Sequence, residues 1–297
     1  MLSRNPEEEE FEEADRLLDS INFPTFDRQT LVRDRPTTSS PVMYNSHVIL
    51  MNKFAFELEG NPKELVIASQ FVNGADNSGG KIWEASTLLA EWIISDGPTL
   101  FANRSVLELG AGVSGLPGLS ASIFAESVSL TDGQDSMVEY LSLNLDLNKE
   151  ILRQTRCLVE GITSELTVNC FNLNWDHVTS QQQEKYAKHF DIIIASEIIY
   201  DAVNTDSMAS AFDTLLKEDG TAFIILPARS RSTHNESEFL TQLAVLGFSM
   251  QAQEIFDIKQ VEQSTEVNLQ QDTKQSCEDG VEDERYVLYS CQREKNW

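Results

Sequence analysis

Short apolar runs alternate with longer amphipathic stretches over most of the chain. From residue 104 onward, runs of β type such as SVLELG, SVSLTD, FDIIIAS and TAFIILP are each followed by a stretch whose apolar residues recur at helical spacing. The run YVLYSCQRE comes last. Strands that alternate with helices are typical of an open, mostly parallel sheet with helices on both faces. We therefore predict an α/β, Rossmann-like core over residues 81–293.

The segment before this core has a different pattern. Residues 46–72 carry three β-like runs, and the sequence EGNP at residues 59–62 is a turn signal between the last two, so we predict a short β-hairpin there. The sequence NSGG at residues 77–80 predicts a flexible loop. The amphipathic stretch that follows, KIWEASTLLAEWIISDG, predicts a helix that ends at Gly97 and Pro98.

We expect residues 46–297 to form a single domain. Two segments differ from the rest of the chain: one precedes this domain and the other lies within it. Residues 1–45 are expected to form an acidic, mobile extension, because residues 7–15 are rich in carboxylates and a run of like charges usually stays solvated. Residues 260–284 are polar and acidic, and we expect them to form a loop inserted before the last strand.

The charge balance restricts the class of partner. The 297 residues include 48 acidic and 22 basic ones, which gives a net charge of −26. Nucleic-acid affinity comes largely from Lys and Arg, so RNA and DNA are disfavoured as partners, whereas a basic protein is favoured. No apolar run reaches the roughly 18–20 residues of a membrane span. The four cysteines show no metal-binding spacing, so we expect no metal site and a reducing compartment, the cytoplasm or the nucleus. A monomer is the favoured oligomeric state.

The sequence VLELGAGVSG at residues 106–115 places a GxGxxG pattern between a predicted strand and a predicted helix. Glycines allow a sharp turn and a close approach of the backbone to a ligand. The pattern alone would suggest a dinucleotide. Here Glu108 stands two residues before Gly110, and a carboxylate at that place would repel a pyrophosphate but suit a ligand with positive charge. This favours S-adenosylmethionine, which has a sulfonium and an ammonium group.

Four further residues fall at the carboxyl ends of three predicted strands, where open α/β sheets bind ligands. Asp132 ends the second strand and is placed to accept hydrogen bonds from both ribose hydroxyls, although it could also cap the next helix. Glu197 and Tyr200 follow the apolar strand DIIIA and are candidates for chemistry or for an ordinary strand-to-helix turn. Trp175 could cover an adenine ring or belong to the core.

Five motifs occur in a familiar order and spacing: GGKIWEASTLLAEWI, VLELGAGVSGLPGL, LTDG, NWD and SEIIYD. Together they resemble the seven-β-strand S-adenosylmethionine-dependent methyltransferases. More narrowly, the chain resembles the methyltransferase-like family 16 of protein lysine methyltransferases over about residues 54–293. The resemblance implies an open seven-stranded sheet, preceded here by the hairpin, and S-adenosylmethionine as the cofactor.

The resemblance also implies roles for single residues. The cofactor site would be formed by Trp83, Glu108, Gly110, Gly112, Asp132, Trp175 and Ser196. In that site Glu108 and the two glycines would hold the methionine part and the ribose, Asp132 the ribose hydroxyls and Trp175 the adenine. Glu197 and Tyr200 would face the substrate as catalytic residues. The family's D-x-x-Y element is here E-I-I-Y, so the acid is one methylene longer.

We therefore expect an S-adenosylmethionine-dependent N-methyltransferase that transfers a methyl group in line to a lysine side chain of a protein. Related enzymes with S-E-x-x-Y methylate histidine, so a protein histidine N-methyltransferase is an alternative, as is methylation of a protein N-terminus. A small-molecule amine N-methyltransferase is another. A further alternative is a non-catalytic cofactor-binding partner protein, in which Glu197 and Tyr200 would be dispensable.

Overall fold

The structure is a computed structural model. It describes residues 27–34, 41–44, 47–70, 78–200, 203–228, 235–255 and 285–294. The acidic run at residues 7–15 and the expected insert at residues 260–284 lie outside the described residues.

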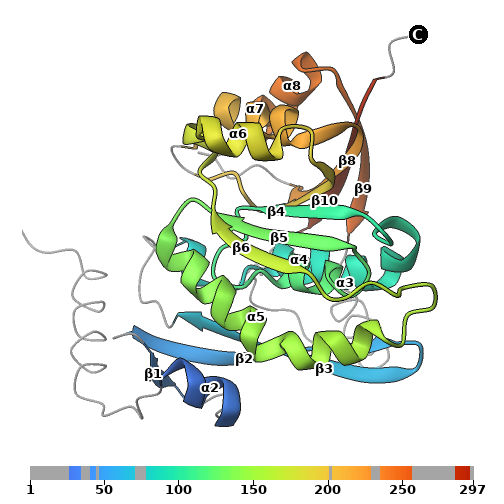
Figure 1. The fold of residues 1–297 in the computed structure, drawn as a ribbon. Helices are drawn as coiled ribbons and strands as arrows, with labels where there is room; N and C mark the ends of the chain where they lie inside the picture. Colours follow the sequence, from blue (N-terminus) through green and yellow to red (C-terminus); the bar gives the residue numbers. More distant parts are fainter. Residues whose placement is uncertain are drawn as a thin grey trace, which may run out of the picture.

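A seven-stranded sheet forms the centre of the protein (Figure 1). Its strands lie in the order β6-β5-β4-β7-β8-β10-β9. All neighbours are parallel except β10, which is antiparallel to both β8 and β9. The predicted α/β, Rossmann-like fold with seven strands is confirmed. The strands are β4 (Ser105–Leu109), β5 (Ser127–Asp132), β6 (Val168–Asn172), β7 (Phe190–Ser196), β8 (Leu216–Pro227), β9 (Phe248–Ile255) and β10 (Tyr286–Arg293).

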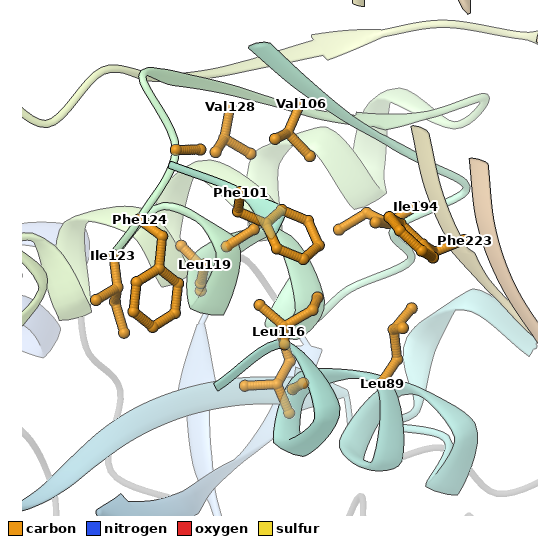
Figure 2. Packing of buried hydrophobic residues seen from close by; sticks show 14 of the residues in the cluster. Leu89, Phe101, Val106, Leu116, Leu119, Ile123, Phe124, Val128, Ile194 and Phe223 are labelled. Atoms are coloured by element: carbon orange, nitrogen blue, oxygen red, sulfur yellow. The ribbon is translucent and has the colours of Figure 1, made fainter. Parts of the chain in front are cut away.

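Helices cover both faces of this sheet, and each face has its own core. On one face, α3 (Glu84–Leu100), α4 (Leu116–Ala121) and α5 (Asp135–Arg156) pack on alternate residues of the strands. Figure 2 shows this core, with the ring of Phe101 among Leu89, Leu116, Ile194 and Phe223. On the other face lie α7 (Thr205–Leu215) and α8 (Glu236–Val245), and α6 (Ser180–Tyr186) lies beside α7 (Figure 1).

The predicted hairpin is present and belongs to a separate antiparallel sheet of three strands. It consists of β1 (Val42–Tyr44), β2 (His47–Leu58) and β3 (Asn61–Gln70). Two of the three β-like runs join into the single strand β2, and β3 packs against α5 (Figure 1). The short helix α2 (Arg28–Asp34) also packs on α5, where Arg28 pairs with Asp146 and Leu31 is fully buried. These described parts of residues 1–45 are thus joined to the domain.

Two details of the core differ from the prediction. Helix α3 continues through Gly97 and Pro98 to Leu100. Gly97 is there for packing, since a Cβ at this position would lie 2.3 Å from the ring of Phe124. The stretch after α8, which we did not predict as a strand, forms β9.

Candidate functional site

A glycine-rich turn connects β4 to α4 at the carboxyl edge of the sheet; we call residues 110–115 the glycine loop. Gly110 and Gly112 have φ values of 68° and 57°, in the left-handed region that favours glycine. A Cβ on Gly112 would lie 3.1 Å from the carbonyl oxygen of Gly79, and the N–H of Val113 donates to that oxygen over 2.7 Å. The turn η1 (Ser78–Gly80), expected to be a flexible loop, is therefore hydrogen-bonded to the glycine loop.

The N–H groups at the start of the glycine loop have partners within the chain. The N–H of Ala111 donates to the carbonyl oxygen of Thr131 over 2.8 Å. The N–H of Gly112 donates to Oδ2 of Asp132 over 3.0 Å. Together with the bond from Val113, three consecutive N–H groups are satisfied. The glycine loop therefore does not present these groups to an anionic ligand.

Glu108 lies in β4 with its side chain turned toward α4, and only 1% of the residue is exposed. Its Oε2 accepts a hydrogen bond from the N–H of Gly118, in the first turn of α4, over 2.8 Å. Burial raises the pKa of Glu108 to about 8, and the nearby charge of Asp132 adds to this effect, whereas the hydrogen bond from Gly118 opposes it. This hydrogen bond ties α4 to β4, and the expected contact of Glu108 with the cofactor stays a prediction.

Asp132 is at the end of β5, as predicted, and faces the glycine loop. Its Oδ2 accepts from the N–H of Gly112 and its Oδ1 from the N–H of Gln134, both over 3.0 Å. Burial raises the pKa of Asp132, while the hydrogen bonds from Gln134, Gly112 and Gly133 oppose this rise. Each carboxylate oxygen keeps acceptor capacity for a further donor, such as a ligand hydroxyl.

Glu197 follows β7 directly and has an unusual backbone. Its φ of 50° is uncommon for a residue with a side chain, and strained residues of this kind concentrate at functional sites. The N–H of Glu197 donates to the carbonyl oxygen of Ile225 over 3.0 Å, which fixes the turn to β8. Both carboxylate oxygens of Glu197 are buried from solvent. Ser196, the last residue of β7, is half-buried next to it.

The segment after Glu197 packs onto the glycine loop. A Cβ on Gly110 would lie 3.0 Å from Cγ2 of Ile198 and 3.2 Å from Cζ3 of Trp175. Trp175 begins the short turn η2 (Trp175–His177) after β6. Tyr200 is 42% exposed, and its pKa is raised by partial burial and by the negative charges of Asp132 and Asp176. The glycine loop, Asp132, Trp175 and the segment 196–200 are thus brought to one place.

Trp83, expected to border the cofactor, lies four residues after Gly79 in the chain. It immediately precedes α3, and its carbonyl oxygen accepts from the N–H groups of Ser86 and Thr87 in the first turn. Its side chain is half-buried, on the same short segment as Gly79. Among the described residues, no group of three or more His, Cys, Asp or Glu side chains could hold a metal ion. No helix in that part of the chain is long and apolar enough to cross a membrane.

Two residues that the sequence does not place in the site, Gly79 and Asn144, hold the glycine loop through hydrogen bonds with Val113. The sequence predicts only a flexible loop around Gly79 and gives no role to Asn144, whose Nδ2 donates to the carbonyl oxygen of Val113 over 2.9 Å. A signal for Asn144 is present, because Asn144 and Asn148 lie four residues apart among the leucines of the stretch LSLNLDLN. Two amides at helical spacing on an apolar face indicate buried groups with defined partners.

The comparison with protein families decides which class of α/β protein this is. The model of the lysine methyltransferase family matches residues 60–245. The chain belongs to this family. Its curated relatives include the mouse protein-lysine N-methyltransferase EEF2KMT, which is 32% identical over 120 residues, or 40% of this chain and 34% of the mouse protein. Protein-lysine methyltransferase METTL21E of mouse is 24% identical over 201 residues, or 67% of this chain and 72% of that protein.

A further relative comes from a fungus. Protein-lysine N-methyltransferase rrg1 of Schizosaccharomyces pombe is 29% identical over 180 residues, which are 58% of this chain and 54% of the fungal protein. The match with EEF2KMT spans only about a third of that relative's length.

Proposed function

We propose that this protein is an S-adenosylmethionine-dependent N-methyltransferase that methylates lysine side chains of a protein. The observation that carries the proposal is the meeting of three elements at the carboxyl edge of the sheet: the glycine loop, the carboxylate of Asp132 and the strained segment at Glu197. Membership of the lysine methyltransferase family supports the same conclusion.

The residues present fit S-adenosylmethionine better than a dinucleotide. A pyrophosphate in this fold is bound by free N–H groups of the glycine turn and of the helix N-terminus. Here the N–H groups of Ala111, Gly112 and Val113 already have partners, and the carboxyl group of Glu108 takes the N–H of Gly118. A cofactor without phosphate groups does not need these donors.

The parts of the cofactor can be assigned to the residues that meet at this edge. Asp132 has acceptor capacity for the ribose hydroxyls, and Trp175, next to Gly110, offers a ring to the adenine. Gly110 and Gly112 keep side chains away from the methionine part. Ser196 and Trp83 border the site. When bound, the cofactor supplies a methyl group activated by its sulfonium.

The protein's own task is to position a neutral nitrogen and exclude water. A lysine amine, with an ordinary pKa of about 10.4, has to lose a proton before it reacts. The carboxylate of Glu197 holds the incoming amine by accepting a hydrogen bond, and because its oxygens are buried, an amine that reaches them has left bulk water. The exposed side of Tyr200 lines the approach.

We further propose a basic protein segment as the substrate. Asp132 and Asp176 both act electrostatically on Tyr200, so the approach to Glu197 carries negative charge that attracts a lysine ammonium. The net charge of −26 over the whole chain acts in the same direction. We also propose the cytoplasm or the nucleus as its compartment, which suits the free thiols of Cys157, Cys170 and Cys291.

The test uses purified protein, radiolabelled S-adenosylmethionine and a cell extract separated into protein, RNA and small-molecule fractions. We expect label in the protein fraction, recovered as methylated lysine after hydrolysis. Glu197→Gln should lower the rate about 100-fold, the order that a small misplacement of a reacting group can cost. Glu160→Gln, which changes an exposed carboxylate elsewhere, is the matched control and should keep full activity.

The other outcomes identify the alternatives. Methylhistidine in the hydrolysate would replace lysine by histidine as the acceptor. Label in the small-molecule fraction alone would indicate a small amine as substrate. Unchanged turnover in Glu197→Gln would refute the role given to that carboxylate, and cofactor binding without any label would support a non-catalytic partner protein.

A further inference from the structure

Two buried asparagines on α5 face the free edge of β3. Asn144 and Asn148 are 0% and 1% exposed and lie one helical turn apart. Asn148 accepts from the N–H of Val66 and donates to the carbonyl oxygen of the same residue, both over 2.8 Å. Asn144 does the same with Ala68, over 2.7 Å and 3.0 Å. Each side chain thus exchanges two hydrogen bonds with one strand residue.

This arrangement solves a problem that the fold creates. Among the strands that the structure describes, β3 is the edge strand of the three-stranded sheet, and its outer edge is covered by α5 (Figure 1). Buried N–H and C=O groups need partners, and a helix backbone cannot supply them. A side-chain amide has an acceptor oxygen and two N–H donors, so it can pair with the N–H and the C=O of one strand residue and keep one N–H for another partner. The two asparagines therefore pair with β3 in place of a further strand.

The two asparagines differ in their third hydrogen bond. The remaining N–H of Asn148 donates to the carbonyl oxygen of Asn144, within α5 itself, over 2.8 Å. The remaining N–H of Asn144 donates to the carbonyl oxygen of Val113, in the glycine loop, over 2.9 Å. Of the two, Asn144 alone connects the hairpin to the glycine loop.

We infer that Asn144 is a positioning residue that couples the β2–β3 hairpin to the cofactor site, so that cofactor binding and order at the β3 edge reinforce each other. The inference rests on the function proposed above. Val113 is held from both sides, with its N–H on Gly79 and its carbonyl oxygen on Asn144. Without the amide of Asn144, the loop loses the second of these anchors, and the geometry that Gly110 and Gly112 present to the cofactor becomes less defined.

The pair offers a matched experiment, in which Asn144→Ala and Asn148→Ala are compared with the unmodified protein. Both variants leave one β3 residue without its partners, so we expect similar losses of Tm. Affinity for S-adenosylhomocysteine, measured by calorimetry, should fall about tenfold in Asn144→Ala, the factor that about 1.4 kcal/mol represents. It should stay unchanged in Asn148→Ala. In turnover, KM for S-adenosylmethionine should rise in Asn144→Ala while kcat at saturation is retained.

Each other outcome of this experiment has a definite meaning. Equal affinities in all three proteins, or equal losses in the two variants, would overturn the coupling and leave asparagines that only complete the edge of β3. If the unmodified protein does not bind S-adenosylhomocysteine, the proposed function fails, and the coupling fails with it. A fall in kcat alone would also contradict a role in positioning the cofactor.

A second measurement needs no substitution and covers the case in which Asn144→Ala does not fold. Hydrogen exchange of single amides is followed by NMR with and without S-adenosylhomocysteine. The N–H of Ala68 is bonded to Asn144, and the N–H of Val66 to Asn148. We expect the ligand to increase protection of Ala68 more than that of Val66. An equal increase at both amides, or none at Ala68, would overturn the coupling.

Discussion

Replacing Glu108 by glutamine should stabilise the protein, by an amount that grows as the pH rises. The side chain is almost completely buried, and burial raises its pKa from 4.5 to about 8. Glutamine keeps an oxygen that can accept the hydrogen bond from Gly118, but it carries no titrating proton. The substitution therefore removes the cost of ionising or protonating this position and changes little else.

The sign and the size follow from proton linkage. Between pH 4.5 and pH 8, folded Glu108 holds a proton that the unfolded chain releases, so the free energy of unfolding falls with rising pH. The slope is about 1.4 kcal/mol for each pH unit. At pH 7 the cost to the wild-type protein is thus about 3 kcal/mol, and above pH 8 it levels off near 5 kcal/mol. Glu108→Gln escapes this cost.

The assay is urea unfolding of both proteins at pH 5, 6, 7 and 8. We expect the difference in unfolding free energy to be small at pH 5 and to increase by about 3 kcal/mol by pH 7. Glu160→Gln, at an exposed position, is the control and should run parallel to the wild-type protein. If Glu108→Gln also runs parallel, Glu108 titrates as it does in the unfolded chain, and the argument from burial is refuted.

Two further predictions concern Gly110 in the glycine loop and Asp191 near the start of β7. Gly110→Ala should abolish cofactor binding and lower stability more than Gly161→Ala, because Gly161 shares the positive φ but a Cβ there has no atom within 4 Å. Equal losses of stability with binding retained would refute this. Burial alone would raise the pKa of Asp191, but the hydrogen bonds from Lys217 and Ser105 outweigh it and lower the pKa to about 2. Asp191→Asn should be less stable at pH 7, and its deficit in urea unfolding should shrink as the pH falls from about 4 to 2. A deficit that does not depend on pH would contradict this.

The parallel strands could be predicted because they are buried on both faces and read as continuous apolar runs. FDIIIAS, which becomes β7, is the clearest case. β9 lacks this signal, because only Phe248 among its eight residues is buried. Its position is set by pairing with β10, a contact distant in sequence. The end of α3 also depends on a contact outside the local sequence. Gly97 packs on Phe124, whereas the sequence of the helix alone shows only a helix breaker.

In the site, as in the fold, some residues can be located from the local sequence, whereas others depend on contacts that are distant in sequence. Asp132 and Glu197 could be located because they end predicted strands, and the fold brings such ends together. The face of the sheet toward which the Glu108 side chain points can be predicted from the alternation of side chains along a strand. Leu107 and Leu109 face the core beneath α7 and α8, so Glu108 must face α4, away from them. Asn144 could not be assigned a partner from sequence, because its partners are 76 and 31 residues away.

The burial of Glu108 also changes the reason why this glycine loop selects its ligand. A negative charge on Glu108 would repel pyrophosphate, but a carboxyl group with a pKa of about 8 is mostly protonated at neutral pH. Charge repulsion is then too weak to exclude a dinucleotide. What excludes it is that the N–H groups a phosphate would need are already bound, by Asp132, by Gly79 and by Glu108 itself. A neutral Glu108 can still accept the hydrogen bond from Gly118, so this selectivity persists whether or not the group is ionised.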